Sequence, residues 1–379
     1  MKIGILTLPL RTNIGGILQC YALQTVLQNM GHEVVVLDRD FSYPSFKVLL
    51  RRLGSFVKCL VKVLILKKND VRIVNPFKLH YYPSYTVCDN SRLERFVNMY
   101  ICKTKPIRSS RELRLYVLSH HLDCIVVGSD QVWRESYSPS ITDYFLGFIP
   151  SCMKIKRIAY AASFGARTNS ISSLMMKECV GLAKEFNFIS MREASGVEML
   201  KSLFGLDAVH VLDPTLLLKN EHYMRLIKVK NIHVELETYI LDRDSVKDEI
   251  IDYISDKMPL SRSDFSPELI NGVSVHPTVE SWLSVFENAD FIVTDSFHGC
   301  VFSIIFRKRF MVILNGERGV DRIYSLLDMF GLNDRLIRSF EDIKGRESVL
   351  YMPIDYDAVY ERYGKLKDYS MSFLCNALK

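Results

Sequence analysis

The side chains best suited to chemistry lie in a short segment around residue 295. Phe291–Val293 is an apolar run typical of a buried strand, and three good helix N-caps, Thr294, Asp295 and Ser296, follow it. A helical apolar pattern then begins at His298. Ligands of open α/β sheets bind at the carboxyl ends of strands, and a helix N-terminus attracts anions. We therefore expect an anion site here, with His298 and Asp295 as catalytic residues and Ser296 contacting the substrate.

The charge state of His298 follows from its expected position on the first turn of a helix. The positive end of the helix dipole lowers the pKa of a histidine, so His298 is expected to be neutral at rest. A neutral imidazole can act as a general base. The alternative is a histidine with a purely structural hydrogen bond.

Arg192 directly follows a second apolar strand. An arginine at a strand end can form two parallel hydrogen bonds to a carboxylate or phosphate, so we expect Arg192 to bind an anionic substrate. The alternative is an ion pair with Glu193 or Glu198.

The connection between the first strand and the first helix, residues 12–16, carries paired glycines. Gly15 and Gly16 allow backbone amides to approach a ligand closely, and Asn13 stands beside them. The pattern is neither the dinucleotide-binding glycine motif nor a P-loop, so it gives little support for a nucleotide cofactor. The alternative is a tight turn capped by Asn13.

Two further loops follow apolar strands. The loop 128–133 is polar and ends in one of only two tryptophans, a combination that suits hydroxyl recognition and sugar stacking. The alternative is a capped turn whose tryptophan fills the core. The loop 315–322 is charged and could reach the same site, or could simply be solvated. The substrate-binding residues expected in these loops are Ser129, Asp130, Gln131, Trp133, Glu317, Arg318 and Arg322.

Several classes of protein find no support in the sequence. No cluster has metal-ligand spacing, and there is no Asp-x-Asp after a strand, which argues against a metal-dependent GT-A glycosyltransferase. The absence of Gly-x-Ser-x-Gly excludes an α/β-hydrolase. We expect no metal and no organic cofactor.

Positive charge is concentrated in one segment. The net charge is +6, but residues 41–72 alone carry eight basic residues and one acid. This distribution argues against nucleic-acid binding by the surface as a whole. Within the segment, residues 45–67 read as an amphipathic helix with one apolar face and one basic face. It could lie on an anionic membrane, or pack on its own domain with a solvated basic face.

The elements that must position these residues alternate between strand and helix. Apolar runs and helical stripes repeat along the chain, which predicts an α/β fold with parallel sheets. Pro214 marks a junction, and the alternation resumes beyond it. We expect two Rossmann-like domains that face a cleft, 1–206 and 207–345, and a helical tail, 346–379, that packs back on the first domain.

The expected location is the cytoplasm. The first residues lack the apolar core of a signal peptide, no uncharged apolar stretch is long enough to span a bilayer, and the nine cysteines form no Cys-x-x-Cys pair. The basic helix adds possible peripheral contact with the inner face of the plasma membrane.

Taken together, the motifs resemble those of the polysaccharide pyruvyl transferase family. The matching segments are Asn13–Gln24, Val127–Trp133, Tyr160–Gly165, Met191–Gly196, Val211–Thr215, Thr294–Gly299 and Asp321–Ile323. The resemblance implies a GT-B-like fold and transfer of the enolpyruvyl unit of phosphoenolpyruvate to a sugar, usually as a cyclic ketal. It also implies donor binding by Arg192 and catalysis by His298. The implied acceptor is a glycan or a lipid-linked sugar of a surface polysaccharide.

One residue departs from the family pattern. Some relatives have an arginine where this chain has Ser296, so another cation, Arg318 or Arg322, must replace it on the donor.

Two other functions remain open from the sequence. A GT-B glycosyltransferase that uses a nucleotide sugar would share the two-domain cleft and its anion sites. A non-catalytic scaffold would use the basic helix at the membrane and would not need His298.

Overall fold

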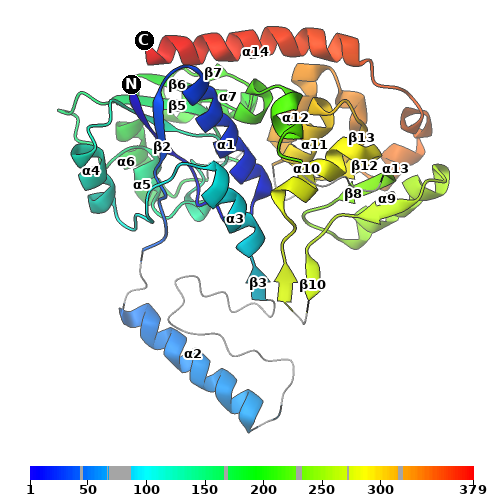
Figure 1. The fold of residues 1–379 in the computed structure, drawn as a ribbon, viewed down its shortest axis with the longest axis horizontal. Coiled ribbons are helices and arrows are strands. Elements are labelled where there is room, and N and C mark those ends of the chain that lie inside the picture. The colour runs from blue at the N-terminus through cyan, green and yellow to red at the C-terminus, as the bar shows by residue number, and fades with distance from the viewer. Residues whose placement is uncertain are drawn as a thin grey trace.

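The computed structural model describes residues 1–42, 46–65, 67, 87–165, 170–227, 233–270, 273–314 and 319–379. Its first half is built on a parallel sheet of order β2-β1-β4-β5-β6-β7 (Figure 1). The strands are β1 (Lys2–Leu6), β2 (Glu33–Val36), β4 (Cys124–Val127), β5 (Lys156–Ala162), β6 (Phe188–Met191) and β7 (Val209–His210).

Helices cover both faces of this sheet because its strands are apolar on both sides. Along β4, Cys124 and Val126 enter one core cluster while Ile125 and Val127 enter the other. The first face packs against α1 (Ile14–Asn29) and α3 (Ser91–Tyr100). The second face packs against α4 (Ser110–Ser119), α5 (Ile141–Tyr144), α6 (Ser173–Ala183), α7 (Ala194–Met199) and a π-helical turn, Leu200–Phe204.

The second half repeats this architecture with the parallel order β14-β13-β12-β8-β9. Its strands are β8 (Val234–Tyr239), β9 (Arg262–Asp264), β12 (Ala289–Thr294), β13 (Arg309–Ile313) and β14 (Leu336–Ile337). Its helices are α8 (Asn220–Met224), α9 (Ser245–Lys257), α10 (Val279–Asn288), α11 (Phe297–Ile305), α12 (Val320–Phe330) and α13 (Phe340–Lys344).

The two halves share one apolar core. A single cluster runs from Ile3 and Ile17 in the first half to Ile292 and Val301 in the second. This shared core holds the carboxyl ends of β1 and β12, and the helices that follow them, in a fixed relationship. The expected two-domain α/β fold is therefore present.

The boundaries differ from the expected ones in one place. Strand β7 pairs with β6 through Ser190 and Val209, so the first sheet extends past residue 206. The sequence 207–210 is too short and too little apolar to read as a strand, and only its pairing with β6 defines it.

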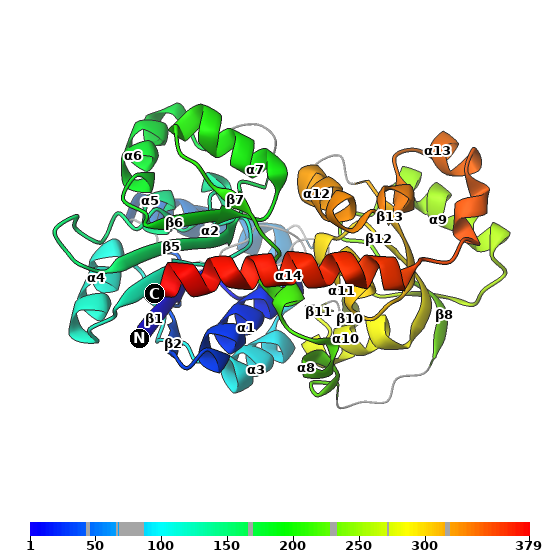
Figure 2. The same ribbon diagram turned by 90° about the horizontal axis from the view of Figure 1, so that it is seen from above.

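Helix α14 (Tyr356–Leu378) leaves the second half and crosses the first, as Figure 2 shows. The Ser370 hydroxyl accepts a hydrogen bond from the Leu212 amide at 3.0 Å, and the Phe373 ring contacts Tyr160 and Phe188. The chain's two ends consequently lie near one another in Figure 2.

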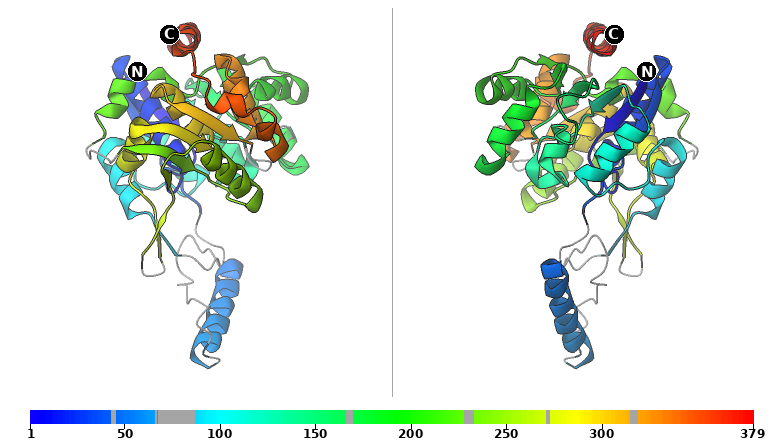
Figure 3. Two further views of the ribbon diagram at one scale, coloured as in Figure 1. Left: turned by 90° about the vertical axis from the view of Figure 1, so that its right-hand side faces the viewer. Right: turned by 90° about the vertical axis from the view of Figure 1, so that its left-hand side faces the viewer.

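A small third sheet and helix α2 lie below the main body in Figures 1 and 3. The sheet has the order β10-β11-β3 and comprises β3 (Val87–Asp89), β10 (Glu268–Ile270) and β11 (Val273–Val275). Helix α2 (Phe46–Leu64) corresponds to the predicted amphipathic helix. Across the described residues, no helix is long and apolar enough to cross a membrane.

Candidate active site

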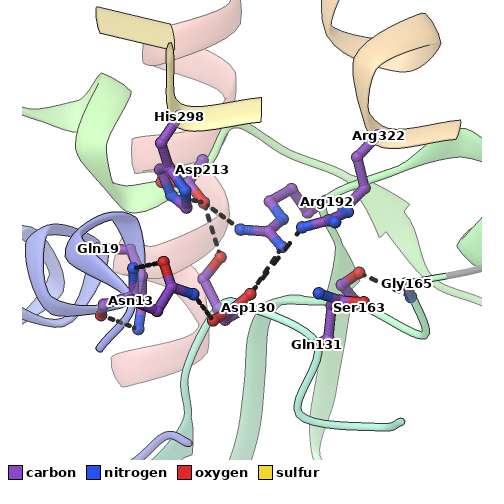
Figure 4. A network of polar contacts seen from close by, with 12 residues as sticks. Asn13, Gln19, Asp130, Gln131, Ser163, Gly165, Arg192, Asp213, His298 and Arg322 are labelled. Atoms are coloured by element: carbon purple, nitrogen blue, oxygen red, sulfur yellow. Dashed lines mark hydrogen bonds and ion pairs between the residues drawn. The ribbon is translucent and has the colours of Figure 1, made fainter. Parts of the chain in front are cut away.

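A cavity of about 650 Å³ opens between the two halves at the carboxyl ends of their sheets. The first half contributes the β1–α1 connection and the loop after β4, and the second half contributes the starts of α11 and α12. Its lining includes the predicted residues Asn13, Gly15, Gly16, Asp130, Gln131, Asp295, Ser296, His298 and Arg322. The structure thus brings together side chains more than 300 residues apart in the sequence (Figure 4).

His298 stands on the first turn of α11, as predicted. Ser296 caps this helix, its hydroxyl accepting a hydrogen bond from the Gly299 amide at 3.3 Å. The histidine is 6% exposed, and its Nε2 has no hydrogen-bond partner among the described residues. A Cβ on Gly15 would lie 2.0 Å from His298 Nδ1, so the glycine is what allows α1 to approach the ring.

The carboxylate nearest to His298 belongs to Asp213. The distance from His298 Nε2 to Asp213 Oδ2 is 3.9 Å. Burial lowers the pKa of His298 to about 4, and the negative charge of Asp213 acts against this shift without reversing it. The imidazole is therefore neutral at rest and faces a carboxylate that would stabilise its protonated form.

Asp213 is fully buried and held by several donors. Arg192 donates from Nη1 at 2.8 Å and Ser129 from its hydroxyl at 2.8 Å, while Thr215 donates from both its amide and its hydroxyl. Burial favours the neutral acid, but the charge of Arg192, the charge of His298 and the hydrogen bonds together outweigh it, and the pKa falls to about 2. Asp213 was not among the predicted site residues.

Arg192 is held by two buried carboxylates. Its side chain is 1% exposed, and its guanidinium is occupied by Asp213 at 2.8 Å and Asp130 at 3.4 Å. Burial disfavours its charge, yet these two carboxylates raise its pKa. Arg192 is not among the residues that line the cavity, and direct binding of an anionic substrate by Arg192 stays a prediction. Of the expected alternative partners, the negative charge of Glu193 also raises the pKa of Arg192.

Asp130 joins the two halves of the polar network. Asn13, the N-cap of α1, donates from Nδ2 to Asp130 Oδ2 at 3.0 Å, and Arg322 Nη1 lies 4.0 Å from Asp130 Oδ1. Asp130 has a φ of +78°, a strained conformation for a residue other than glycine. Strain of this kind concentrates at functional sites, and here it aims the carboxylate at three different elements.

Besides Arg11, which is paired with Asp40, the described residues that line the cavity include one further cation, Arg322. It lines the wall from the first turn of α12, and Gly319 leaves room for it, since a Cβ there would lie 2.3 Å from Nη2. Burial and the neighbouring Arg192 lower its pKa to about 10, which leaves it charged at neutral pH. Its Nε has no hydrogen-bond partner within the described part of the chain.

Phe297 separates the two arginines. Its ring lies 4.6 Å from Arg192 Cζ and 5.7 Å from Arg322 Cζ, both cation–π distances. The aromatic residue before His298 therefore reduces the repulsion between two guanidinium groups. The sequence offered no indication of this role.

The carboxylate of Asp295 is held by the loop after β8 and by α9. It accepts hydrogen bonds from the Leu241 and Asp242 amides and an ion pair from Lys247 at 2.9 Å. It thereby fastens the loop after β8 to the start of α11. Asp295 lines the cavity, but the carboxylate 3.9 Å from His298 Nε2 belongs to Asp213, so a catalytic role of Asp295 stays a prediction.

Trp133 does not stack on a sugar either. It is fully buried, stacks on Phe145 with ring centroids 4.9 Å apart, and donates from Nε1 to the Tyr144 carbonyl. The core-filling alternative therefore holds for Trp133. The aromatic rings of Phe, Tyr or Trp that do line the cavity are Phe41, Tyr137, Tyr239 and Phe297, and only Phe297 lies within one of the predicted motifs.

The remaining predicted residues have mixed outcomes. Ser129 is buried and supports Asp213 rather than the cavity. Gln131 accepts a hydrogen bond from Arg134 and packs against Gly165, whose φ is +72°. Glu317 and Arg318 lie outside the described residues. Within the residues that the structure describes, no group of three histidine, cysteine or acidic side chains could hold a metal ion.

Two parallel α/β halves with a polar cavity between them define the GT-B-like class of two-domain proteins. Solved structures share this fold. The UDP-GlcNAc 2-epimerase of Neisseria meningitidis has a TM-score of 0.54 at 12% identity, over 99% of this chain and 100% of that one. The UDP-GlcNAc 2-epimerase of Methanocaldococcus jannaschii has a TM-score of 0.50 at 13% sequence identity, over 94% of this chain and 93% of that one. A glycosyltransferase of Rickettsia africae has a TM-score of 0.50 at 9% sequence identity, over 98% of this chain and 93% of that one.

The family is established by a separate match. Residues 13–317 match polysaccharide pyruvyl transferase, and the chain belongs to that family. The match spans both halves of the cavity, from Asn13 to the β13–α12 connection. A comparison with curated proteins finds no significant match.

Proposed function

We propose that this chain transfers the enolpyruvyl group of phosphoenolpyruvate to a sugar of a surface polysaccharide or of its lipid-linked precursor. The product is a pyruvate ketal, and phosphate is released. The observation that carries the proposal is the buried His298 Nε2, unpartnered among the described residues, 3.9 Å from Asp213 Oδ2 in the wall of a cavity that also exposes Arg322.

The cavity suits a small ligand with two anionic groups. Phosphoenolpyruvate carries a phosphate and a carboxylate, which need cations and helix N-termini. The first turns of α1, α11 and α12 all contribute to the wall, and Arg322 supplies a full positive charge. We assign to Arg322 the donor-binding role that Ser296 cannot fill.

His298 is the acid–base group of the proposed reaction. An anionic donor beside the ring raises its pKa above the resting value, so the imidazolium can protonate the methylene carbon. The resulting oxocarbenium-like centre at carbon 2 is attacked by a sugar hydroxyl, whose proton returns to the imidazole. The carbon–oxygen bond to phosphate then breaks, and a second hydroxyl closes the ketal while its proton leaves with phosphate. Asp213 stabilises the imidazolium before the methylene carbon is protonated and again after the first hydroxyl has returned a proton to the ring.

The acceptor would enter on the side of Phe41 and Tyr137. Both rings line the cavity, and aromatic faces are common sugar platforms. Arg134 lies over the Tyr137 ring at 4.3 Å and fixes its orientation. Together with the polysaccharide family, this supports a sugar acceptor.

A nucleotide-sugar glycosyltransferase is the second candidate, and the GT-B-like fold favours it. The two candidates differ in the ligand that they bind. Titration calorimetry with phosphoenolpyruvate, UDP and GDP separates them: we expect binding of phosphoenolpyruvate alone. Binding of UDP or GDP without phosphoenolpyruvate would overturn the proposal.

Turnover is tested with purified protein, phosphoenolpyruvate and lipid-linked or free glycans. We expect phosphate release together with a ketal that mass spectrometry detects on the glycan. The His298→Ala variant is the negative control for chemistry, and a variant that kept the full rate would refute the role of His298.

A further inference from the structure

Helix α2 presents an apolar surface that the body of the protein leaves uncovered. Leu50, Val57 and Leu64 are 52%, 55% and 69% exposed. Among the residues of α2 whose burial the structure describes, none is buried. An exposed apolar stripe of this length marks a surface that contacts something else.

The positive charge of α2 indicates which kind of surface the helix contacts. Residues 46–64 contain five basic residues, Lys47, Arg51, Arg52, Lys58 and Lys62, and no acid. Pairing of α2 with a second copy through the apolar stripe would bring two sets of five positive charges together. An anionic bilayer instead accepts the apolar stripe and the positive charge at once.

A second apolar feature lies on the same side of the molecule. Strand β10 projects from the body on the side where α2 lies, as Figures 1 and 3 show. Its Leu269 and Ile270 are 71% and 43% exposed. Helix α2 and strand β10 come from segments about 200 residues apart in the sequence. The fold is therefore what places both on the same side of the molecule.

The helix is also tied closely to the cavity. Phe41 lines the cavity wall and α2 begins at Phe46. Five residues of chain span at most about 18 Å, so a helix held at a surface keeps this wall of the cavity near that surface.

We propose that α2 lies flat on an anionic lipid bilayer, together with the tip of β10, and so holds the cavity near membrane-bound acceptors. The lipid contact stands by itself, whereas the delivery of a lipid-linked acceptor rests on the proposed function. The ligand class is the headgroup layer of an anionic phospholipid surface.

Sedimentation with vesicles tests the contact. We expect the full chain to sediment with phosphatidylglycerol–phosphatidylcholine vesicles at low salt and far less with pure phosphatidylcholine. The double variant Arg51→Glu/Arg52→Glu should lose partitioning by about 100-fold or more, since each basic residue near such a surface contributes to binding. The Leu50→Ser/Val57→Ser variant should also lose it.

Matched controls keep the result interpretable. Arg111 and Arg114 are exposed on α4, on the main body, so Arg111→Glu/Arg114→Glu should sediment like the unaltered chain. His298→Ala should bind vesicles normally, which separates lipid contact from the proposed chemistry. Transfer to a soluble acceptor should be unaffected by the α2 substitutions.

Three outcomes would overturn the proposal. The first is no sedimentation with anionic vesicles, and the second is equal sedimentation of the Arg51→Glu/Arg52→Glu variant. The third is a dimer in light scattering that Leu50→Ser/Val57→Ser dissolves, which would assign the stripe to a second copy.

Discussion

Asp213 Oδ2 accepts from Arg192 and Ser129 and also lies 3.9 Å from His298 Nε2. One buried oxygen therefore faces a permanent cation, a hydroxyl and a titratable ring. Because its other two partners fix it in place, it can stabilise a proton on His298 without moving. Arg192 is thus linked to the histidine through Asp213.

Replacement of His298 tests the acid–base role. His298→Ala should lower kcat by about 10²- to 10⁴-fold, the usual contribution of a positioned acid–base group, with little change in the KM for phosphoenolpyruvate. The measurement is initial-rate phosphate release. His222→Ala on α8, outside the cavity, is the matched control and should retain the full rate.

Replacement of Arg322 tests donor binding. Arg322→Met removes the charge but keeps most of the length, and we expect the Kd for phosphoenolpyruvate to rise at least tenfold because the cavity loses one of its two lining cations, the other being Arg11, which Asp40 pairs. Calorimetry measures this directly. Arg338→Met, at an exposed arginine that contacts Tyr324, should bind the donor normally. Unchanged affinity in Arg322→Met would place the donor elsewhere.

Replacement of Asp213 tests the buried network. Asp213→Asn leaves the Arg192 charge without its main partner, and breaking a buried ion pair in this way costs about 3–5 kcal/mol of unfolding free energy. Urea denaturation measures the loss. The double variant Arg192→Met/Asp213→Asn should lose less than the sum of the two single variants. Additive losses would mean that the pair is not coupled.

The low pKa of His298 predicts a pH dependence of stability. The folded pKa is about 4, below the ordinary value of 6.5, so between these pH values the unfolded chain binds a proton that the folded chain does not. The free energy of unfolding should therefore fall as the pH drops through this window, by up to about 1.4 kcal/mol per pH unit from this residue. His298→Gln should show a shallower slope in urea denaturation between pH 6.5 and 4.

Replacement of Gly15 tests the close approach of α1. A Cβ there would overlap the His298 ring at 2.0 Å from Nδ1, so Gly15→Ala must displace the ring or the helix and should lower kcat at least tenfold. Gly181 on α6 has nothing within 4 Å of a Cβ, and Gly181→Ala is the control that should leave activity unchanged. Full activity in Gly15→Ala would show that the His298 ring can be displaced without loss of activity.

The sequence predicted the local features of the site well. The strand, cap and helix around His298 lie within one continuous segment, and β12, the Ser296 cap and α11 confirm them. The Asn13 cap and Gly15–Gly16 turn are likewise local. The same holds for helix α2, Phe46–Leu64, which lies within the predicted range 45–67.

Long-range partners could not be predicted. Asp213 reaches His298 across 85 positions of sequence, and its motif read equally well as a simple junction before Pro214. Asp295 stood nearer to His298 in sequence, but the side chain direction at a strand end depends on the neighbouring loop, here that of Leu241. The burial of Trp133 depends on Phe145 and Phe164, which no local pattern connects to it.

Helix α14 is translated last among the described helices, although it packs on elements that are translated first. It is the last helix of this sequence, yet its Leu374, Ala377 and Leu378 belong to the core that β1 and α1 begin. During synthesis, about 200 residues are translated after Tyr160 before the helix that covers it on the first sheet is complete. Until α14 is translated, the apolar side chains that it covers on the first sheet lack this part of their native packing.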